Sequence, residues 1–226
     1  MLAERFLVVI PALNAAASVA GVVKASLAHL PDVVVVNDGS TDATPKAAAG
    51  AGATVLHHPQ NLGKGAALKT GFRYALERGF DAVVTVDADG QHLPSEIPKF
   101  VRAFRETGAD LVIGDRSHLF EGMLPRRRNA NMFSAWAISQ CAGTRVGDSQ
   151  SGFRLYSASL LRDVEIRANG FAAESEIIVR AGRLGRNVIS IPIDLGFVNG
   201  VSTSHYRPLL DTLRIAGVVA RTRFFG

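Results

Sequence analysis

The chain is poor in cysteine and has no long apolar run. Its 226 residues include one cysteine, Cys141, which excludes an intrachain disulfide and a zinc site built from several cysteines. No window contains the roughly 18 unbroken apolar residues of a membrane-spanning helix. The apolar stretch near the N-terminus is too short for a signal peptide and lacks a basic start. We therefore expect a cytoplasmic location, with any membrane contact confined to the surface.

Aromatic residues are scarce, and the common nucleotide-binding motifs are missing. Phe, Tyr and Trp make up 7% of the chain, and no nucleic-acid-binding motif is present, so we expect no nucleic-acid partner. The first apolar run is not followed by G-x-G-x-x-G, and the glycines around Lys64 lack the P-loop pattern. The net charge of +5 favours anionic lipids or phosphorylated ligands as partners.

Apolar runs alternate with helical patterns through the first half of the chain. Continuous apolar runs are typical of strands that are buried on both faces of a parallel sheet. We therefore predict an α/β fold, with a mostly parallel, Rossmann-like sheet flanked by helices. Strands are expected at residues 5–10, 32–37, 53–58, 81–87 and 109–115, and helices at 14–30, after Thr41 or Asp42, at 63–78 and at 95–107.

The pattern loosens after Asp115, where a polar segment without clear periodicity follows. No linker or change of composition divides the chain, so we predict a single domain over residues 1–226. The later elements are expected to be helices at 129–142 and 171–185, strands at 151–157 and 187–193, and a basic amphipathic helix from Pro208.

Polar residues follow four of the predicted strands. In an open parallel sheet, ligands bind beyond the carboxyl ends of the strands, so these residues are expected to converge on one site. They are Pro11 and Asn14 after the first strand, Asp38, Gly39 and Ser40 after the second, Asp87, Asp89 and Gln91 after the fourth, and Gly114, Asp115 and Arg116 after the fifth.

Asp87 and Asp89 form the most informative pair. Two carboxylates this close would repel each other, and a divalent cation would remove that cost. A hard oxygen site with few protein ligands suits Mg²⁺ or Mn²⁺, with phosphate oxygens completing the shell. A capped loop with solvated acids is the alternative. A calcium-binding EF-hand loop fits badly, because Gly90 stands at the fourth position of the loop and not at the sixth.

Other single residues leave two interpretations open. Asp38 would accept hydrogen bonds from a base or ribose, or belong to an ordinary Asp-Gly turn. Lys64 would contact a phosphate or base, or belong to a glycine-rich helix start. Asp148 would be a base, a neighbour of an acceptor phosphate, or the ion-pair partner of Arg154. Six arginines suit phosphate contacts, although some would only solubilise the surface: Arg116, Arg126, Arg127, Arg128, Arg154 and Arg207.

Acids and histidines elsewhere favour structural roles. Glu174 and Glu176 are two residues apart on a predicted helix, so they face different sides, and early acids suit the helix dipole. Hydrogen-bonded structural roles are expected for His57, His58 and His205.

The order of the motifs resembles that of family 2 glycosyltransferases with the GT-A fold. The likeness is strongest to the dolichyl/polyprenyl-phosphate sugar transferase branch, over about residues 5–160 with a weaker tail to about 208. The motifs that carry it are VVIPALN, VVVVNDGSTDAT, NLGKGAAL, VTVDADGQHLP, GDR and DSQSGFRLYS.

The resemblance implies an inverting transferase that uses a divalent metal ion and a UDP- or GDP-sugar. The donor half would extend to about residue 115 and the acceptor half over 116–226. The resemblance implies that the donor nucleotide is bound by Pro11, Asn14, Asp38, Lys64 and Asp87. It implies that the metal ion is held by Asp87 and Asp89, which form the DXD motif, and by Gln91. It also implies catalytic roles for Asp89, Asp148 and Arg116, and acceptor binding by Arg116, Arg128, Ser134 and Arg207.

Two departures from the family pattern affect these expectations. Ala15 stands where the family usually has a glutamate, and Arg207 would replace a basic residue of the family's acceptor loop. A phosphate acceptor is already ionised at neutral pH, so the arginine cluster favours polyprenyl phosphate at the cytoplasmic membrane face. The alternatives are a hydroxyl acceptor, which needs a general base, and a nucleotide-sugar-binding protein or nucleotidyltransferase.

Overall fold

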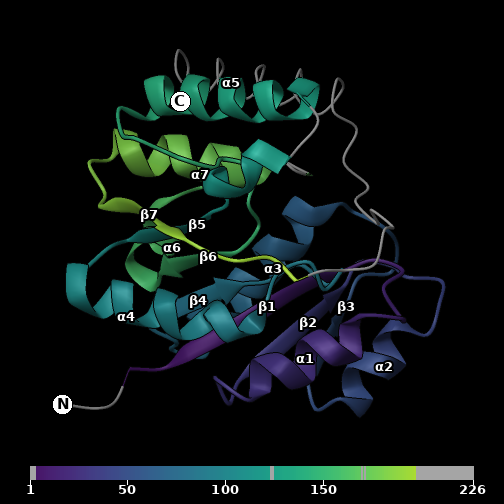
Figure 1. The fold of residues 1–226 in the computed structure, drawn as a ribbon. Coiled ribbons are helices and arrows are strands. Elements are labelled where there is room, and N and C mark those ends of the chain that lie inside the picture. The colour runs from purple at the N-terminus through teal and green to yellow at the C-terminus, as the bar shows by residue number, and fades with distance from the viewer. Residues whose placement is uncertain (1–3, 123–124, 169, 171, 197–226) are drawn as a thin grey trace.

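The apolar runs form one seven-stranded sheet. The computed structural model describes residues 4–122, 125–168, 170 and 172–196 (Figure 1). The strand order is β3-β2-β1-β4-β6-β5-β7, and every neighbouring pair is parallel except those that involve β6. The strands are β1 Phe6–Ala12, β2 Val33–Asn37, β3 Thr54–His57, β4 Ala82–Thr85, β5 Leu111–Asp115, β6 Arg154–Ser157 and β7 Val188–Pro192. The predicted mostly parallel sheet is confirmed.

Helices cover both faces of the sheet, which explains why the central strands read as continuous apolar runs. Along β2, Val34 and Val36 pack into one core cluster, and Val33 and Val35 pack into the other, as the alternation of side chains along a strand requires. The first cluster includes residues of α3 Lys64–Glu77, α6 Ala158–Asp163 and α7 Ala172–Arg183; the second includes residues of α1 Val19–Leu27, α2 Thr44–Gly50 and α4 Ile97–Thr107.

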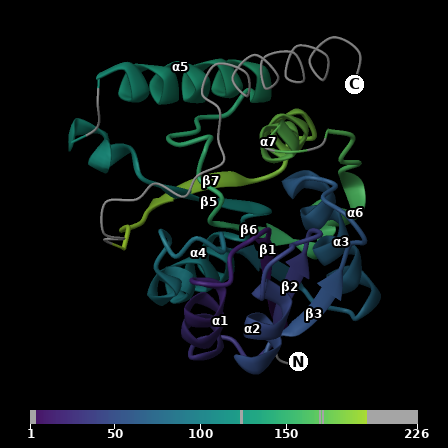
Figure 2. The same cartoon turned by 90° about the vertical axis from the view of Figure 1, so that its right-hand side faces the viewer.

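One further helix, α5 Pro125–Ala142, lies beyond α7 and forms an outer layer on that side (Figure 2). Ile138 and Ala142 of α5 join the core cluster that α7 helps to build. The two helices approach closely at Gly182, because a Cβ atom there would overlap the carbonyl oxygen of Ala142. A small residue at this crossing therefore sets the position of α5 over the sheet.

The antiparallel strand β6 has the greatest effect on the site. It lies between β4 and β5, with Thr85 opposite Arg154 and Leu111 opposite Tyr156. Because β6 runs against its neighbours, the segment before Arg154 lies at the carboxyl ends of β4 and β5. Asp148 and the residues that follow it are thereby brought to the edge where ligands bind in such sheets.

Several boundaries differ from the sequence-based expectation. The helix expected at 14–30 is the shorter α1, and the short helix near Thr41 begins at Thr44. Part of the segment expected to be irregular forms the 3-10 helix η2 Ser117–Gly122, and α5 begins at Pro125 rather than near 129. Helix α6 and the 3-10 helix η1 Pro94–Glu96 were not predicted. The basic helix expected from Pro208 lies outside the described residues.

The packing of α3 on β1 can be tested at Gly71. A Cβ atom at Gly71 would collide with the side chain of Val9, so Gly71→Ala is expected to lower the free energy of unfolding by about 1–3 kcal/mol. At Gly21 of α1, such a Cβ would have no neighbour within 4 Å among the described residues, apart from the adjacent backbone of the helix. Gly21→Ala is therefore expected to raise the free energy of unfolding by up to about 1 kcal/mol. Urea unfolding of both variants checks the contrast, and equal stabilities would contradict this packing.

Candidate active site

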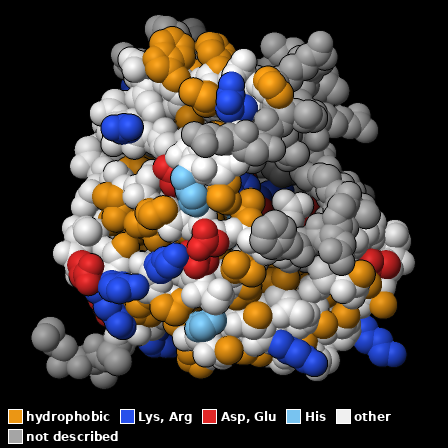
Figure 3. All heavy atoms as spheres, in the orientation of Figure 1, with side chains coloured by type: hydrophobic (Ala, Val, Ile, Leu, Met, Phe, Trp, Pro, Cys, Tyr) orange, Lys and Arg blue, Asp and Glu red, His pale blue; other side chains and the backbone are white. Residues whose placement is uncertain are grey.

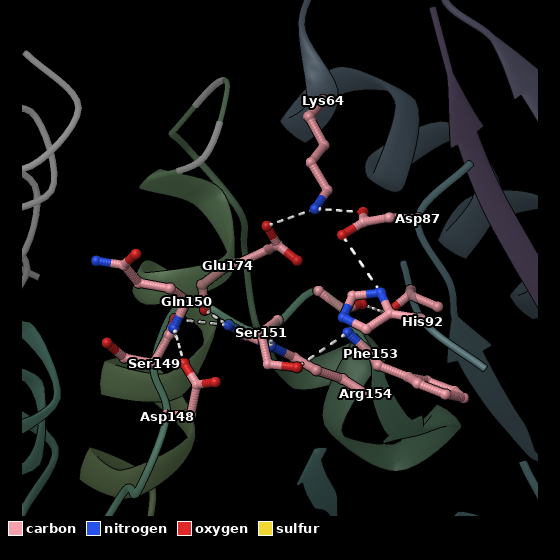
Figure 4. Close-up of polar contacts among 12 residues, drawn as sticks. Lys64, Asp87, His92, Asp148, Ser149, Gln150, Ser151, Phe153, Arg154 and Glu174 are labelled. Carbon is pink, nitrogen blue, oxygen red and sulfur yellow. Dashed lines mark hydrogen bonds and ion pairs between the residues drawn. The ribbon is translucent and has the colours of Figure 1, made fainter. Parts of the chain in front are cut away.

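Lys64, the first residue of α3, connects the segment after β4 to α7 through two ion pairs. Its Nζ lies 2.7 Å from Oδ1 of Asp87, which follows β4, and 3.0 Å from Oε2 of Glu174 in the first turn of α7 (Figure 4). Burial raises the pKa of Asp87, but the charge and hydrogen bond of Lys64, together with the charges of His92 and Arg116, outweigh burial and lower that pKa to about 2. Burial works in the opposite direction on the pKa of Lys64, and the two carboxylates outweigh it and raise that pKa.

Asp89 lies beside this bridge in a less favourable environment. Burial and then the negative charge of Asp87 raise the pKa of Asp89. Its Oδ1 accepts a hydrogen bond of 2.9 Å from the backbone N–H of Gln91. A cation held between the two aspartates would offset their repulsion, and this fits a hard divalent metal ion.

The described residues near Asp87 offer few side-chain ligands for a metal ion. Among the described residues, no group of three or more His, Cys, Asp or Glu side chains could hold a metal ion. Asp87, Asp89 and the neutral Gln91 would therefore supply only part of a coordination shell, and ligand oxygens would supply the rest. Gly152 keeps the space beside Asp87 open, because a Cβ there would lie 2.5 Å from Oδ2 of Asp87 and 2.7 Å from Nζ of Lys64.

His92 is a buried neighbour of Asp87 that the sequence interpretation missed. Its Nδ1 lies 3.6 Å from Oδ2 of Asp87, and its ring packs against Phe153 with a centroid distance of 5.4 Å. Burial lowers the pKa of His92 to about 4, although the charge of Asp87 opposes this shift. The imidazole is therefore neutral at pH 7. The sequence signal that could have identified His92 as a site residue was its position three residues after Asp89.

Arg116 and Asp148 form a second ion pair in the site. Nε of Arg116 donates to Oδ2 of Asp148 over 2.6 Å, and the backbone N–H of Gln150 donates to Oδ1 over 2.9 Å. Of the interpretations left open, the pairing of Asp148 with Arg154 is therefore wrong. The charge of Arg116 also acts on the pKa values of both Asp87 and Asp89, so the second pair lies within electrostatic reach of the first.

Arg154 is a structural residue and not a surface contact for phosphate. Its side chain is completely buried, and it donates to the carbonyl oxygens of Ser151, Glu174 and Ser149 over 2.7, 2.8 and 2.9 Å. These bonds tie the segment before β6 to α7. The expectation that Arg154 binds phosphate is wrong, because no solvent-accessible surface of this side chain remains for a ligand.

The residues expected at the nucleoside lie on the adjoining strand ends. Pro11 lies near the end of β1 and Asn14 follows that strand. Oδ1 of Asn14 accepts a 2.9 Å hydrogen bond from the N–H of Thr41 in the loop after β2. Asp38 is buried, and it accepts hydrogen bonds from the N–H groups of Leu62 and Gly63 over 3.0 and 2.8 Å. Asp38 therefore fixes the loop that leads to Lys64.

The histidines at the end of β3 make the structural contacts expected of them. His58 bridges Asp38 and the hydroxyl of Thr70, with distances of 2.7 and 2.9 Å. His57 lies 3.5 Å from the side-chain amide of Asn37, measured from Nδ1 to Nδ2. His205 lies outside the described residues.

The predicted acceptor residues lie on α5 and its surroundings. Ser134 is buried, with its Oγ 3.1 Å from Oγ of Ser149. Arg128 lines a groove of about 980 Å³ between α5 and residues 143–147, together with Met132 and Trp136. Hydrophobic side chains gather over α5 at the top of Figure 3. Arg207 and the side chains of Arg126 and Arg127 lie outside what the structure describes.

Glu174 is the other site residue that the sequence interpretation missed. The helix-dipole explanation accounted only for its place in the first turn of α7. In the structure the side chain is buried, and its Oε2 holds Lys64, whereas Oε1 has no hydrogen-bond partner within the described part of the chain. Glu176 pairs with Arg180 instead, so the two acids face different partners as expected. The sequence signal that could have identified Glu174 as a site residue was its position as an acid within a run of otherwise buried residues.

Comparison with known proteins identifies the family. Residues 7–165 match the model described as Glycosyl transferase family 2. The chain is 35% identical to an undecaprenyl-phosphate mannosyltransferase of Micrococcus luteus, over 72% of this chain and 70% of that one. It is 31% identical to a polyprenol monophosphomannose synthase of Mycolicibacterium smegmatis, over 96% and 89% of the two chains.

A solved structure gives the same fold. Glucosyl-3-phosphoglycerate synthase from Mycobacterium tuberculosis, solved in complex with Mn²⁺, UDP and phosphoglyceric acid, superposes with a TM-score of 0.77 at 21% identity, over 99% of this chain and 80% of that one. The chain belongs to glycosyl transferase family 2, and the predicted GT-A fold and transferase class are confirmed.

The burial of a neutral His92 predicts a pH dependence of stability. An unfolded histidine takes up a proton near pH 6.5, whereas folded His92 takes it up only near pH 4. Stability is therefore lost as the pH falls from 6.5 to 4, by on the order of 3 kcal/mol from this residue. Unfolding measured across that interval should show a smaller loss in His92→Leu than in the parent chain.

The exposed His29 supplies the matched control for this experiment. His29→Leu is expected to keep the pH dependence of the parent chain. If His92→Leu loses as much stability between pH 6.5 and 4 as the parent does, His92 is not buried in its neutral form.

Proposed function

We propose that this glycosyltransferase moves a sugar, with inversion, from a UDP- or GDP-sugar to a polyprenyl phosphate, with the help of Mg²⁺ or Mn²⁺. The observation that carries the proposal is the meeting of Asp87, Asp89 and Lys64 with the Arg116–Asp148 pair at one edge of the sheet. The names of two relatives refer to undecaprenyl phosphate and to polyprenol, and they support polyprenyl phosphate as the acceptor. The Mn²⁺ and UDP in the structural neighbour support the donor and the metal.

Asp87, Asp89 and Gln91 are the residues that would hold the metal ion. When bound, a divalent cation supplies Lewis-acid neutralisation of charge on the leaving diphosphate. Lys64 adds a second positive charge next to Asp87, at the N-terminus of α3, where backbone N–H groups also favour an anion. Pro11, Asn14 and Asp38 would line the nucleoside side of the donor, within a donor half that extends to about residue 115.

The acceptor half would orient an anion rather than activate a hydroxyl. A phosphate monoester is ionised at pH 7, so it needs positive charge and alignment more than a base. Arg116 and Arg128 would receive the phosphate, with Ser134 nearby and Arg207 as a further contact. The groove beside α5, with Met132 and Trp136 in its wall, suits an isoprenoid chain because it joins apolar surface to Arg128.

The contacts of Asp148 argue against a hydroxyl acceptor. Such an acceptor requires a general base, and Asp148 is the candidate at this position. Both of its oxygens already accept hydrogen bonds, from Arg116 and from the N–H of Gln150. We therefore assign Asp148 to the positioning of Arg116.

A lipid acceptor would bring the chain to the cytoplasmic face of a membrane as a peripheral protein. None of the helices in the described part of the chain has the length and apolarity to cross a bilayer. Exposed Met132, Phe133 and Trp136 on α5 support contact with the membrane surface.

A transfer assay in detergent tests the proposal. The chain is expected to transfer sugar from a UDP- or GDP-sugar to polyprenyl phosphate with Mn²⁺, releasing the nucleoside diphosphate, and to lose activity in EDTA. Asp89→Asn is expected to reduce kcat/KM by about 100-fold or more, because several kcal/mol of charge stabilisation are lost. Asp32→Asn, which changes an exposed acid before β2, should keep the parental rate.

Acceptor comparisons in the same assay separate the alternatives. Polyprenol and soluble sugars, which offer only hydroxyl groups, are expected to be refused. Transfer to those compounds with refusal of polyprenyl phosphate would overturn the acceptor assignment. Release of pyrophosphate would instead indicate a nucleotidyltransferase.

A further inference from the structure

The bridge from Asp87 through Lys64 to Glu174 places an ammonium group on a carboxylate that a metal ion would need. The Nζ of Lys64 is 2.7 Å from Oδ1 of Asp87, a distance typical of a strong charge-assisted contact. Lys64 and Glu174 are largely buried, whereas the side chain of Asp87 keeps 27% of its surface exposed. Asp87 therefore has an open side from which a cation can reach it.

In the absence of ligands, Lys64 balances negative charge at this edge of the sheet. Asp87, Asp89 and Glu174 bring three carboxylates to one edge of the sheet. Among the described residues, Arg116 is engaged by Asp148 at 2.6 Å, and the guanidinium of Arg154 donates to backbone carbonyl oxygens, including that of Glu174. Lys64 is thus the residue that offsets the charges of Asp87 and Glu174. A divalent ion that binds Asp87 must compete with this ammonium group, since two cations on one carboxylate repel each other.

The backbone around Lys64 is fixed, so that only the side chain is free to change partner. The N–H of Gly63 donates to Asp38 over 2.8 Å, and α3 begins at the next residue. Gly152 approaches both members of the pair so closely that a Cβ would lie 2.7 Å from Nζ of Lys64. A lysine side chain, with its flexible four-carbon stem, can exchange one oxygen partner for another without moving the helix.

We propose that Lys64 is a positioning residue that couples metal binding to donor binding. Without ligands it satisfies Asp87, which weakens the site for a metal ion alone. When the metal ion and the donor's diphosphate bind together, Lys64 exchanges Asp87 for phosphate oxygens, and Glu174 keeps it beside the site. This inference rests on the proposed function for its diphosphate ligand, whereas its effect on the metal ion alone does not.

The consequence is a reciprocal coupling between the two ligands. If a nucleoside diphosphate removes Lys64 from Asp87, it strengthens metal binding, and the metal ion strengthens nucleotide binding by the same factor. The buried Oε2 of Glu174 supports this exchange, because it holds Lys64 at 3.0 Å independently of Asp87.

Calorimetric titration of Mn²⁺, with and without saturating UDP or GDP, tests the coupling in the full chain. In the parent chain the nucleotide that binds is expected to tighten the Kd of Mn²⁺ by about tenfold or more. In Lys64→Met, Mn²⁺ alone is expected to bind about tenfold tighter than in the parent, and the effect of the nucleotide shrinks correspondingly. Lys64→Arg keeps the charge and should keep weak binding of Mn²⁺ alone.

Two further variants keep the test decisive. Lys46→Met removes an equal charge from an exposed position of α2, and it should leave both Kd values unchanged. If Lys64→Met does not fold, the double variant Lys64→Met/Glu174→Gln removes the buried ion pair as a unit, and Mn²⁺ alone should again bind tighter than in the parent.

The outcomes separate this inference from the proposed function. Unchanged or weaker binding of Mn²⁺ alone in Lys64→Met, or in the double variant if Lys64→Met does not fold, would overturn the role of Lys64, even if UDP or GDP binds. If neither nucleotide binds the parent chain in the presence of Mn²⁺, the proposed donor fails, and the comparison with Mn²⁺ alone still decides whether Lys64 competes with the metal ion.

Discussion

The geometry of the site depends on the hydrogen bonds that the buried guanidinium group of Arg154 donates. A charge buried in a protein core is costly unless its donors are satisfied. Here three carbonyl oxygens accept from it, and they belong to Ser149, Ser151 and Glu174. The same hydroxyl-rich segment is also held to β4, where Thr85 donates to the carbonyl of Gly152 over 2.8 Å. One side chain thus fixes the Asp148 segment and α7 against the sheet.

Charge balance then organises the groups that these elements carry. The acids that follow β4 meet Lys64 from α3 and Glu174 from α7, and Arg116 after β5 meets Asp148. Each contact joins segments far apart in the sequence. The result is an edge with two acids suited to a cation and two basic groups suited to phosphate, which is the arrangement that transfer between a diphosphate donor and a phosphate acceptor requires.

Local patterns predicted the first five strands and singled out Asp87 and Asp89 as candidate metal ligands, because apolar runs and strand-end acids are local signals. They did not predict that β6 enters antiparallel between β4 and β5. Its four residues are all buried, so no alternation marks its direction, and its neighbours are decided by long-range packing. Arg154 was misassigned for the same reason, since arginine is rarely buried without partners and its carbonyl partners appear only in the folded chain.

Glu174 and His92 escaped prediction for a different reason. Each has an ordinary local explanation, the helix dipole for Glu174 and a solvated loop for His92. Only the sheet and α7 together reveal that His92 is buried beside Asp87 and that Glu174 is buried beside Lys64. Polar residues that are buried without complete hydrogen bonding often mark functional sites, and this property is not visible in a single sequence.

The acids after β4 would form a metal site that a nucleoside diphosphate completes. Thermal unfolding of the unaltered chain with UDP or GDP, in Mn²⁺ or in EDTA, tests this site most directly, because a ligand that binds the folded state raises Tm. We predict that one nucleotide raises Tm in Mn²⁺ and that the rise disappears in EDTA. An equal rise in EDTA, or no rise with either nucleotide, would contradict this assignment.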